Sequence, residues 1–299
     1  MINVDENTIT AAVLEQQANC PNPRLKQIMT SLICHLHDFA REVRLTEGEW
    51  EQGIDFLTRV GHITDDKRQE FILLSDTLGL TMLVNAQNNQ KPPQCTESTI
   101  FGPFFVENAP LFENGGDITN GARGEPCRVS GSVRGLDGQG IPHAEVQVWQ
   151  CDEDGFYDVQ YPELDQAQCR GQLATATDGS FSFHSVLAQA YPIPHDGPVG
   201  QMLELLGRHP WRPAHLHFMI KAPGYQTLIT HIFRDGDPYL ESDAVFGVRS
   251  SLIADWKQIP GTGSDSGTAT CHELNVDIVL NPVSATTTRN NHKTLEATP

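Results

Sequence analysis

The stretch Trp211-Arg-Pro-Ala-His-Leu-His-Phe-Met-Ile220 places two histidines two residues apart in a segment whose pattern predicts a β-strand. Successive side chains of a strand point to opposite faces, so His215 and His217 should share one face. Two imidazoles on one face can bind a single metal ion. The spacing alone fits a second interpretation equally well, in which the two histidines are half-buried and only form hydrogen bonds with neighbouring residues.

The same spacing occurs in Ile33-Cys-His-Leu-His37, where the apolar residues repeat with helical periodicity. Residues two apart on a helix diverge by about 200° at 3.6 residues per turn. We therefore expect that His35 and His37 do not bind one ion. The candidate metal site is placed at His215 and His217 instead.

Around this stretch, from Pro126 onward, apolar and polar residues alternate, and Asp-Gly and Pro-Gly pairs mark turns. Candidate strands cover residues 128–133, 144–150, 172–177, 180–186, 215–221, 227–233 and 273–280. Many short strands without intervening helices predict a β-sandwich. One short helix is expected at about residues 203–208.

Residues 1–91 have helical periodicity. One apolar stripe follows Asn22-Pro23 and consists of Leu25, Ile28, Met29, Leu32, Leu36, Phe39 and Val43. Thr46 and Glu49 fit a capping box that opens a second helix. A third helix is expected from Asp65 to about Gln87. The predicted fold is therefore mainly β, with a helical N-terminal domain attached to the sandwich.

Composition narrows the classes of partner and compartment. The net charge of −18 and the pI of about 4.9 argue against nucleic acid as a partner. No apolar run approaches the roughly 20 residues of a membrane span, and the first residues lack a signal-peptide pattern, so we expect a cytoplasmic protein. The seven cysteines form no Cys-x-x-Cys motif and are expected to be reduced thiols.

Two of the five tyrosines precede the histidines in turn-rich segments. Tyr157 lies in Asp154-Gly-Phe-Tyr-Asp158, and Tyr191 lies in Ala190-Tyr-Pro-Ile-Pro194. No cysteine or carboxylate pattern near the histidines has the usual zinc spacing, which argues against a zinc site.

The order and spacing of several motifs between Ile100 and Trp256 resemble the intradiol ring-cleaving dioxygenases, which are non-haem Fe(III) enzymes. The motifs are Ile100-Phe-Gly-Pro-Phe104, Val129-Ser-Gly-Ser-Val133, Val146-Gln-Val-Trp149, Gly155-Phe-Tyr157, Tyr191 with Gly197-Pro198, Leu206-Gly-Arg-His209 and Arg212-Pro-Ala-His-Leu-His217. The resemblance implies one Fe(III) per subunit, bound by Tyr157, Tyr191, His215 and His217. Tyr161 is the nearest alternative to Tyr157, which is preferred because it follows a Gly-x-Tyr turn.

The charge of this implied ligand set suits a ferric ion. A phenol has a pKa near 10 in water, but a bound trivalent cation favours its ionised form. Two phenolates and one hydroxide would cancel the charge of Fe(III), and neutral imidazoles would complete the coordination. Hard oxygen donors favour Fe(III) over Fe(II).

The resemblance also implies catalytic roles for two residues. A substrate bound as a dianion through both ortho oxygens would displace hydroxide and Tyr191, whereas Tyr157 would stay bound. Arg212 would stabilise the charge that develops on the substrate. A structural alternative is that Arg212 only pairs with a surface carboxylate.

The patterns Phe71-Ile-Leu-Leu-Ser-Asp76, Tyr191-Pro-Ile-Pro194 and Ser242-Asp-Ala-Val245 resemble the hydroxyquinol 1,2-dioxygenases more than the catechol enzymes. By that resemblance, the substrate pocket is lined by Leu73, Asp76, Ile100, Phe101, Gly102, Pro103, Phe104, Ile193, Pro194, Arg212 and Val245. Asp76 would accept a hydrogen bond from the third hydroxyl of benzene-1,2,4-triol and would reject plain catechol, which leaves the carboxylate unpaired. A structural alternative for Asp76 is a solvent-facing or N–H-bonded carboxylate.

Three functions are therefore considered. The first is cleavage of hydroxyquinol with O2 to 3-hydroxy-cis,cis-muconate, which tautomerises to maleylacetate. The second is cleavage of catechol or chlorocatechol, and the third is a non-catalytic β-sandwich that only binds a ligand. His231, at a strand position where catechol enzymes commonly have glutamine, is interpreted as a hydrogen-bonding partner of a ligand; a rival ligand and a simple strand residue are the alternatives.

The expected organisation has four parts. Residues 1–91 form a helical N-terminal domain. The relatives dimerise through this region and can hold a lipid-like molecule at the dimer interface, so the resemblance implies a homodimer here. Residues 92–125 form a loop, and the resemblance implies that this loop covers the active site. The alternative is a simple linker, but two phenylalanines around Gly102-Pro103 would be unusual in a solvated one. Residues 126–283 form the catalytic sandwich, and residues 284–299 form a tail.

Overall fold

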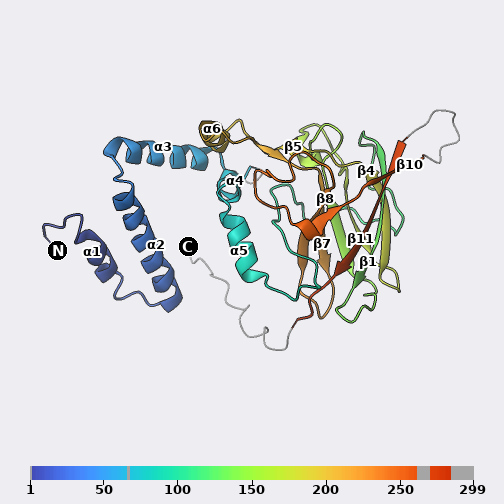
Figure 1. Cartoon of the computed structure of the whole chain (residues 1–299), viewed down its shortest axis with the longest axis horizontal. Helices are drawn as coiled ribbons and strands as arrows, with labels where there is room; N and C mark the ends of the chain where they lie inside the picture. Colours follow the sequence, from blue (N-terminus) through green and yellow to red (C-terminus); the bar gives the residue numbers. More distant parts are fainter. Residues whose placement is uncertain (1, 66–67, 261–269, 284–299) are drawn as a thin grey trace. The chain divides into compact units, whose positions relative to one another are not determined.

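The computed structural model describes residues 2–65, 68–260 and 270–283 (Figure 1). The predicted tail, residues 284–299, lies outside the described residues. By its internal contacts, the chain divides into two compact units, Met1–His62 and Ile63–Pro299. The predicted boundary at residue 91 remains a prediction. None of the helices in the described ranges is both long and apolar enough to cross a membrane.

The first unit contains α1 (Ile9–Gln16), α2 (Pro23–Glu42) and most of α3 (Glu47–Ile63). The Asn22 side chain accepts a hydrogen bond from Leu25 N at 3.0 Å, and Pro23 occupies the first turn of α2, where its missing N–H has no cost. The capping box is confirmed, since Thr46 N donates to Glu49 Oε2 at 2.8 Å and Glu49 N donates to Thr46 Oγ1 at 3.3 Å.

The prediction of one continuous third helix from Asp65 to Gln87 was wrong, because the structure has two helices there. The structure has α4 (Glu70–Thr77) and α5 (Leu80–Asn88), separated at Gly79. Gly79 has a φ of 75°, in the left-handed region that favours glycine, and this conformation ends one helix and starts the next. The uniformly apolar sequence hid the break, because apolar residues continue on both sides of it.

The second unit is a two-layer β-sandwich. One sheet has the order β10-β11-β1-β4, with β10 at Lys257–Pro260, β11 at Thr270–Val279, β1 at Pro126–Arg134 and β4 at Ser180–Val186. The other has the order β3-β2-β7-β8-β9, with β3 at Arg170–Ala174, β2 at Glu145–Trp149, β7 at His215–Lys221, β8 at Leu228–Arg234 and β9 at Ile253–Ala254. The predicted sandwich is therefore confirmed.

Short elements complete this unit. Strands β5 (Tyr191–Pro192) and β6 (Trp211–Arg212) pair with each other, and α6 (Pro198–Leu205) lies between them in the chain. The helix starts earlier than the predicted residues 203–208, because Pro198 is in its first turn. Within the described part of the chain, two 3₁₀ turns occur, at Asp158–Gln160 and Ser250–Leu252.

Strand β7 determines where the site lies. Its residues Leu216, Phe218 and Ile220 belong to the main core between the sheets, together with Phe181 and Phe183 of β4. The alternate residues point away from that core, and Met219 packs in a separate cluster with Phe104, Trp149, Tyr157 and Tyr191. The strand therefore buries apolar side chains on one face and presents its histidines on the other.

Residues 92–125 contain no named helix or strand in the structure, but backbone hydrogen bonds tie them to the sandwich. Thr96 N donates to Val279 O at 3.0 Å, and Thr99 N donates to Ile229 O at 3.0 Å. Further along, Ile118 N donates to His184 O at 2.9 Å. These bonds place Ile100 and the residues after it beside the histidine face of β7, where Phe104 packs on Tyr157.

Candidate metal centre

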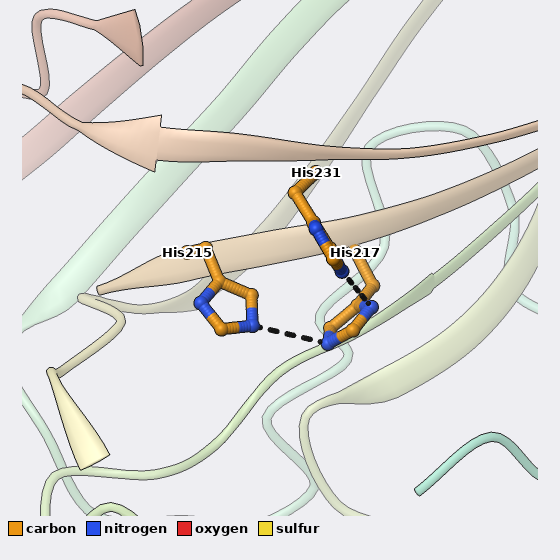
Figure 2. Close-up of side chains that lie close together, drawn as sticks. All are labelled: His215, His217 and His231. Carbon is orange, nitrogen blue, oxygen red and sulfur yellow. Dashed lines mark hydrogen bonds between the residues drawn. The ribbon is translucent and has the colours of Figure 1, made fainter. Parts of the chain in front are cut away.

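The two histidines of β7 converge as the strand geometry predicts. His215 and His217 are 0% and 1% exposed, and their Nε2 atoms lie 3.1 Å apart. By contrast, His35 and His37 lie on α2, and His37 Nδ1 bonds to Thr10 Oγ1 at 2.9 Å. Figure 2 shows His215 and His217 together with a third histidine, His231, from the neighbouring strand β8.

Two tyrosines complete the cluster. The hydroxyl oxygen of Tyr157 lies 3.0 Å from His217 Nε2 and 3.3 Å from the hydroxyl oxygen of Tyr191. Gly155, with a φ of 80°, makes this approach possible, because a Cβ there would lie only 3.1 Å from the Cβ of Tyr191. Tyr191 is held on β5 by pairing with Arg212 on β6.

The alternative tyrosine is not part of the cluster. Tyr161 instead donates a hydrogen bond from its hydroxyl to Asp152 Oδ2 at 2.6 Å. The structure therefore brings together Tyr157, Tyr191, His215 and His217, while their role as ligands remains a prediction.

The spacing of these four donor atoms fits a metal ion. Protein ligands lie roughly 2.0–2.2 Å from a small transition metal, so neighbouring ligand atoms should be about 3.0–3.5 Å apart at angles of 90° to 110°. His215 Nε2 lies 3.1 Å from His217 Nε2, which lies 3.0 Å from the Tyr157 hydroxyl oxygen. That oxygen lies 3.3 Å from the Tyr191 hydroxyl oxygen. The donor set, two imidazoles and two phenols, is also one that a hard trivalent cation accepts.

The protonation of His215 is fixed by its surroundings. Its Nδ1 lies 2.7 Å from Pro213 O, and a carbonyl oxygen can only accept, so Nδ1 carries the proton. In the neutral ring, Nε2 then has a free lone pair that faces the other donors. Burial lowers the pKa of His215, and the charge of Arg212 lowers it further, so the ring is neutral at pH 7.

The hydrogen bond to His231 determines which ring nitrogen of His217 carries the proton. His231 Nε2 lies 2.8 Å from His217 Nδ1, and His231 Nδ1 lies 2.9 Å from Thr99 Oγ1. If His217 Nδ1 donates to His231, then His217 Nε2 is free to bind a metal; the reverse arrangement puts a proton on that atom. Metal binding therefore requires His231 to accept from His217 and to donate to Thr99.

The position of His231 favours this partner role over direct ligation. The three histidines form a buried group with ligand atoms within 4.8 Å, as expected of a metal site. However, the Nε2 atom of His231 bonds to Nδ1 of the His217 ring, whereas the other ring nitrogen, Nε2, is the one that faces His215 and Tyr157. Burial lowers the pKa of His231 well below its usual value, so its ring stays neutral beside the other two.

The two phenols have different electrostatic environments. Burial raises the pKa of Tyr157 well above its usual value, and the neighbouring Tyr191 raises it further. Burial also raises the pKa of Tyr191, but the charge of Arg212 opposes the rise. Arg212 Nη1 lies 3.5 Å from the Tyr191 hydroxyl. A phenolate at Tyr191 thus has a cationic neighbour even when it is not bound to a metal.

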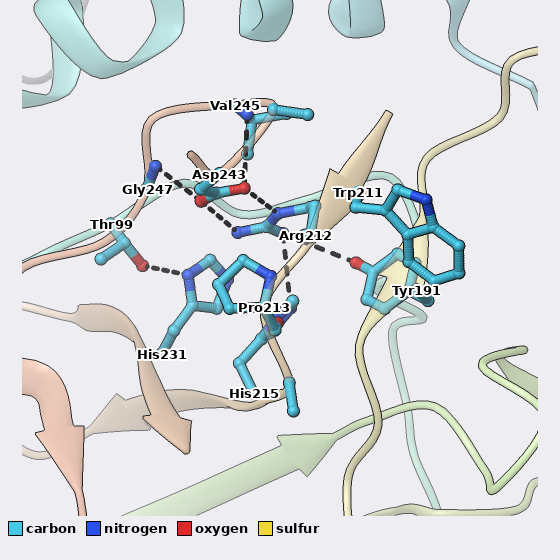
Figure 3. Close-up of polar contacts among 12 residues, drawn as sticks. Thr99, Tyr191, Trp211, Arg212, Pro213, His215, His231, Asp243, Val245 and Gly247 are labelled. Carbon is cyan, nitrogen blue, oxygen red and sulfur yellow. Dashed lines mark hydrogen bonds and ion pairs between the residues drawn. The ribbon is translucent and has the colours of Figure 1, made fainter. Parts of the chain in front are cut away.

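Arg212 is 2% exposed and pairs with a buried carboxylate (Figure 3). Its Nε and Nη2 atoms lie 3.0 and 3.4 Å from Asp243 Oδ1 and Oδ2. Burial would lower the pKa of Arg212, but Asp243 and Tyr191 raise it above its usual value, so the guanidinium stays charged. The alternative of pairing with a surface carboxylate was wrong, because Asp243 is only 5% exposed.

The motif Ile100–Phe104 forms one wall beside the metal cluster. The Phe104 ring stacks on Tyr157 with centroids 4.5 Å apart, and a Cβ at Gly102, whose φ is 77°, would lie 3.2 Å from His217 Cε1. Phe101 packs against Trp149, whose ring stacks on His217 at 4.7 Å. Ile100 is 3% exposed, while Pro103 is partly buried.

The other predicted pocket residues are also mostly buried. Leu73, Ile193 and Val245 are 5%, 4% and 2% exposed, and Pro194 is partly buried. Asp76 on α4 is 2% exposed, and its Oδ1 atom has no hydrogen-bond partner in the structure. That these side chains line one substrate pocket remains a prediction.

Sequence reasoning missed several residues of the site. Asp243 was noticed only as part of the Ser242–Val245 pattern, and no role was given to it. Trp149 and Thr99, which contact His217 and His231, carried no spacing signal because they come from other segments of the chain. The pairing of β2 with β7 is what brings Trp149 opposite His217.

Known dioxygenases are similar to this chain over most of its length. Residues 100–282 match the family model described as "Dioxygenase", and residues 22–96 match "Catechol dioxygenase N terminus". The chain is 61% identical to 6-chlorohydroxyquinol 1,2-dioxygenase of Cupriavidus pinatubonensis, over 94% of this chain and 99% of that protein. It is 53% identical to hydroxyquinol 1,2-dioxygenase of Corynebacterium glutamicum, over 93% and 94% of the two chains.

The fold agrees with the same comparison. The crystal structure of hydroxyquinol 1,2-dioxygenase from Pseudomonas putida DLL-E4 matches with a TM-score of 0.86 and 44% identity, over 93% of this chain and 99% of that chain. The resemblance noted from the sequence motifs is therefore confirmed, and the chain belongs to the intradiol ring-cleavage dioxygenase family.

Proposed function

We propose that this protein is an intradiol dioxygenase that uses O2 to open the ring of hydroxyquinol, benzene-1,2,4-triol, between its two adjacent hydroxyls. The convergence of four buried donor atoms from Tyr157, Tyr191, His215 and His217 carries the proposal. The names of the relatives, which include hydroxyquinol 1,2-dioxygenases, support the substrate. The product would be 3-hydroxy-cis,cis-muconate, which tautomerises to maleylacetate.

These four residues would hold one ferric ion per subunit. The chemistry that such an ion supplies when bound is Lewis acidity toward the two ortho oxygens and activation of the ring toward O2. Two phenolates offset most of its charge, and the two neutral imidazoles add none. Because the cluster is buried, ionised phenols without a cation would be costly there.

Tyr191 would act as the proton acceptor for the incoming substrate. Its hydroxyl oxygen lies at the end of the donor cluster, 3.3 Å from Tyr157 and 3.5 Å from Arg212 Nη1. A phenolate at this oxygen can take the proton of a substrate hydroxyl, while Arg212 stabilises its charge until then. Tyr157 lies between His217 and Tyr191 and would remain in place.

Arg212 would also stabilise negative charge on the substrate ring. Its Nη1 atom faces the cluster, 3.3 Å from His215 Nε2, so substrate oxygens that bind at the cluster would lie close to it. The guanidinium is held there before the reaction begins, which is the arrangement that stabilises a charge developing in the transition state.

Asp76 would select the substrate. Its buried Oδ1 is unpaired, and burial raises the pKa of the carboxyl, an effect that Thr81 and Arg212 partly offset. A third ring hydroxyl can donate to this oxygen, whereas catechol would leave it without a partner. This contact favours a triol over catechol or chlorocatechol. The relative from Cupriavidus pinatubonensis makes 6-chlorohydroxyquinol a second candidate.

Family membership sets aside the third function, a non-catalytic binding module. We place the enzyme in the cytoplasm, which the seven unpaired cysteines support. We also propose that the chain forms a homodimer through its helical N-terminal region. The family resemblance adds to this proposal a lipid-like molecule bound at the dimer interface. The apolar stripe of α2 supports an interface, because Leu25, Ile28, Leu32, Leu36, Phe39 and Val43 are 46–54% exposed.

Light scattering tests the dimer. We expect a particle of about twice the chain mass of 33.0 kDa, because dimerisation would bury the exposed apolar stripe. A mass equal to that of the single chain at micromolar concentration would contradict the proposal. Extraction of the purified protein with organic solvent and mass spectrometry would show whether a lipid accompanies it.

Oxygen uptake tests the substrate and the role of Asp76 together. Wild-type protein should cleave benzene-1,2,4-triol and 6-chlorohydroxyquinol in preference to catechol and 4-chlorocatechol, with maleylacetate or its chloro derivative as the final product. In Asp76→Ala, the ratio of kcat/KM for the triol to that for catechol should fall about 10- to 100-fold, because a hydrogen bond to a charged group is lost.

The control for this experiment is Asp55→Ala, which removes an exposed helical carboxylate paired with Arg59 and should leave the ratio unchanged. An unchanged ratio in Asp76→Ala would show that selectivity does not depend on this carboxylate. A wild-type protein that prefers catechol would refute hydroxyquinol as the substrate.

Iron binding by His231 variants tests the proton arrangement of the site. In His231→Leu, the affinity for iron should fall about 10- to 100-fold, because His217 loses the partner that accepts its Nδ1 proton. His231→Gln keeps an acceptor and should retain most of the affinity. Both variants should still reach one iron per chain when iron is in excess. A variant that binds no iron at any concentration would instead identify His231 as a ligand.

A further inference from the structure

The carboxylate of Asp243 has four hydrogen bonds, two on each oxygen. Oδ1 accepts from Arg212 Nε at 3.0 Å and from Val245 N at 3.3 Å. Oδ2 accepts from Arg212 Nη2 at 3.4 Å and from Gly247 N at 2.9 Å. An ionised carboxylate offers about four lone-pair sites, so none is left for a substrate or a proton in transit. Asp243 therefore differs from Asp76, whose Oδ1 is unpaired.

The pairing also determines which edge of the guanidinium faces the metal cluster. Asp243 occupies the edge formed by Nε and Nη2, which leaves Nη1 to approach Tyr191 and His215 (Figure 3). A guanidinium is planar, so fixing one edge fixes the direction of the remaining nitrogen. Without the carboxylate, nothing in these contacts would keep Nη1 on the side of the cluster.

The same carboxylate shapes the segment that carries Val245. The N–H groups of Val245 and Gly247 both point at Asp243, and Ala244 N donates to Trp211 O at 3.1 Å. Gly247 has little room for a side chain, since a Cβ would lie 3.1 Å from both Arg212 Nη2 and Asp243 Oδ2. The segment is therefore wrapped around the ion pair, and its N–H groups help to hold the carboxylate in the place where it meets Arg212.

We propose that Asp243 is a positioning residue for ring cleavage, which acts through Arg212 by holding Nη1 toward the metal cluster. The inference rests on the function proposed above, in which Arg212 stabilises charge on the substrate. Asp243 itself does not touch substrate or transfer a proton. Its loss should therefore matter only while Arg212 is present.

A double-mutant cycle with Arg212→Met separates this role from a general effect on folding. Both oxygens of Asp243 accept from N–H groups, so in Asp243→Asn the amide NH2 has to face another donor, and the pairing with Arg212 is broken. We expect kcat/KM to fall at least about 30-fold. In the Arg212→Met background, the same substitution should change kcat/KM less than about 3-fold, because the group it positions is already absent. Equal losses in both backgrounds would overturn the proposal.

Urea unfolding of the metal-free proteins provides a readout that does not depend on activity or substrate. Asp243→Asn leaves a buried guanidinium without its carboxylate, so the double variant Arg212→Met/Asp243→Asn should unfold at a higher urea concentration than Asp243→Asn alone. A double variant that is no more stable than the single variant would contradict the coupling. If wild-type protein is inactive toward every diol tested, the proposed function fails, whereas this stability coupling can still hold.

The chain offers a matched control in the pair Arg170–Asp158, which is also buried and bidentate. Asp158 accepts in addition from Val159 N at 2.9 Å and Gln168 N at 3.2 Å, so its pattern of four bonds is the same. Asp158→Asn should lower stability, but its effect should simply add to that of Arg212→Met. Non-additivity of similar size in this control would show that the cycle reports general damage and would overturn the assignment.

Discussion

The site depends on the two faces of strand β7. One face supplies Leu216, Phe218 and Ile220 to the core between the sheets, and burial of such side chains is worth roughly 1.5–3 kcal/mol each. The other face carries His215 and His217, and a slip of one residue in register would exchange the two sets. Pairing with β2 and β8 on both sides prevents that slip, so the energy of the core holds the imidazoles in place.

Electrostatics then explains the identity of the surrounding groups. The buried cluster combines neutral imidazoles and phenols, so ionised phenolates are acceptable there only beside a cation. Arg212 supplies one fixed positive charge, but Asp243 neutralises it, and the pair adds no net charge to the site. A multivalent metal ion is the cation that can balance two phenolates at once. Asp76 is buried as well, and its Oδ1 atom has no hydrogen-bond partner in the structure.

The parts of this arrangement that depend on local pattern could be predicted from the sequence. Alternation in residues 215–221 placed both histidines on one face, Thr46 and Glu49 identified a helix start, and Asp-Gly turns separated the strands. The tyrosines and the substrate pocket came from a resemblance to a family rather than from spacing, because Tyr157 and Tyr191 lie on separate turns. Their distance to the histidines depends on how β5, β6 and β7 are arranged in space.

Contacts between distant segments could not be predicted for the same reason. Asp243 follows Arg212 by 31 residues, and no periodicity connects them. The break at Gly79 was hidden because the helical pattern continues through it, and only the positive φ reveals it. Likewise, the choice of His231 as the partner of His217 follows from the register of β7 and β8, in which the two residues lie directly opposite.

Iron content together with the visible spectrum tests the central claim most directly. Purified wild-type protein should contain one iron per chain and absorb visible light through phenolate-to-iron charge transfer. Tyr157→Phe should shift or bleach that band, because one of the two phenolates is removed. A colourless wild-type protein that takes up no iron after reconstitution, or a Tyr157→Phe protein with an unchanged spectrum, would contradict the proposed ligand set.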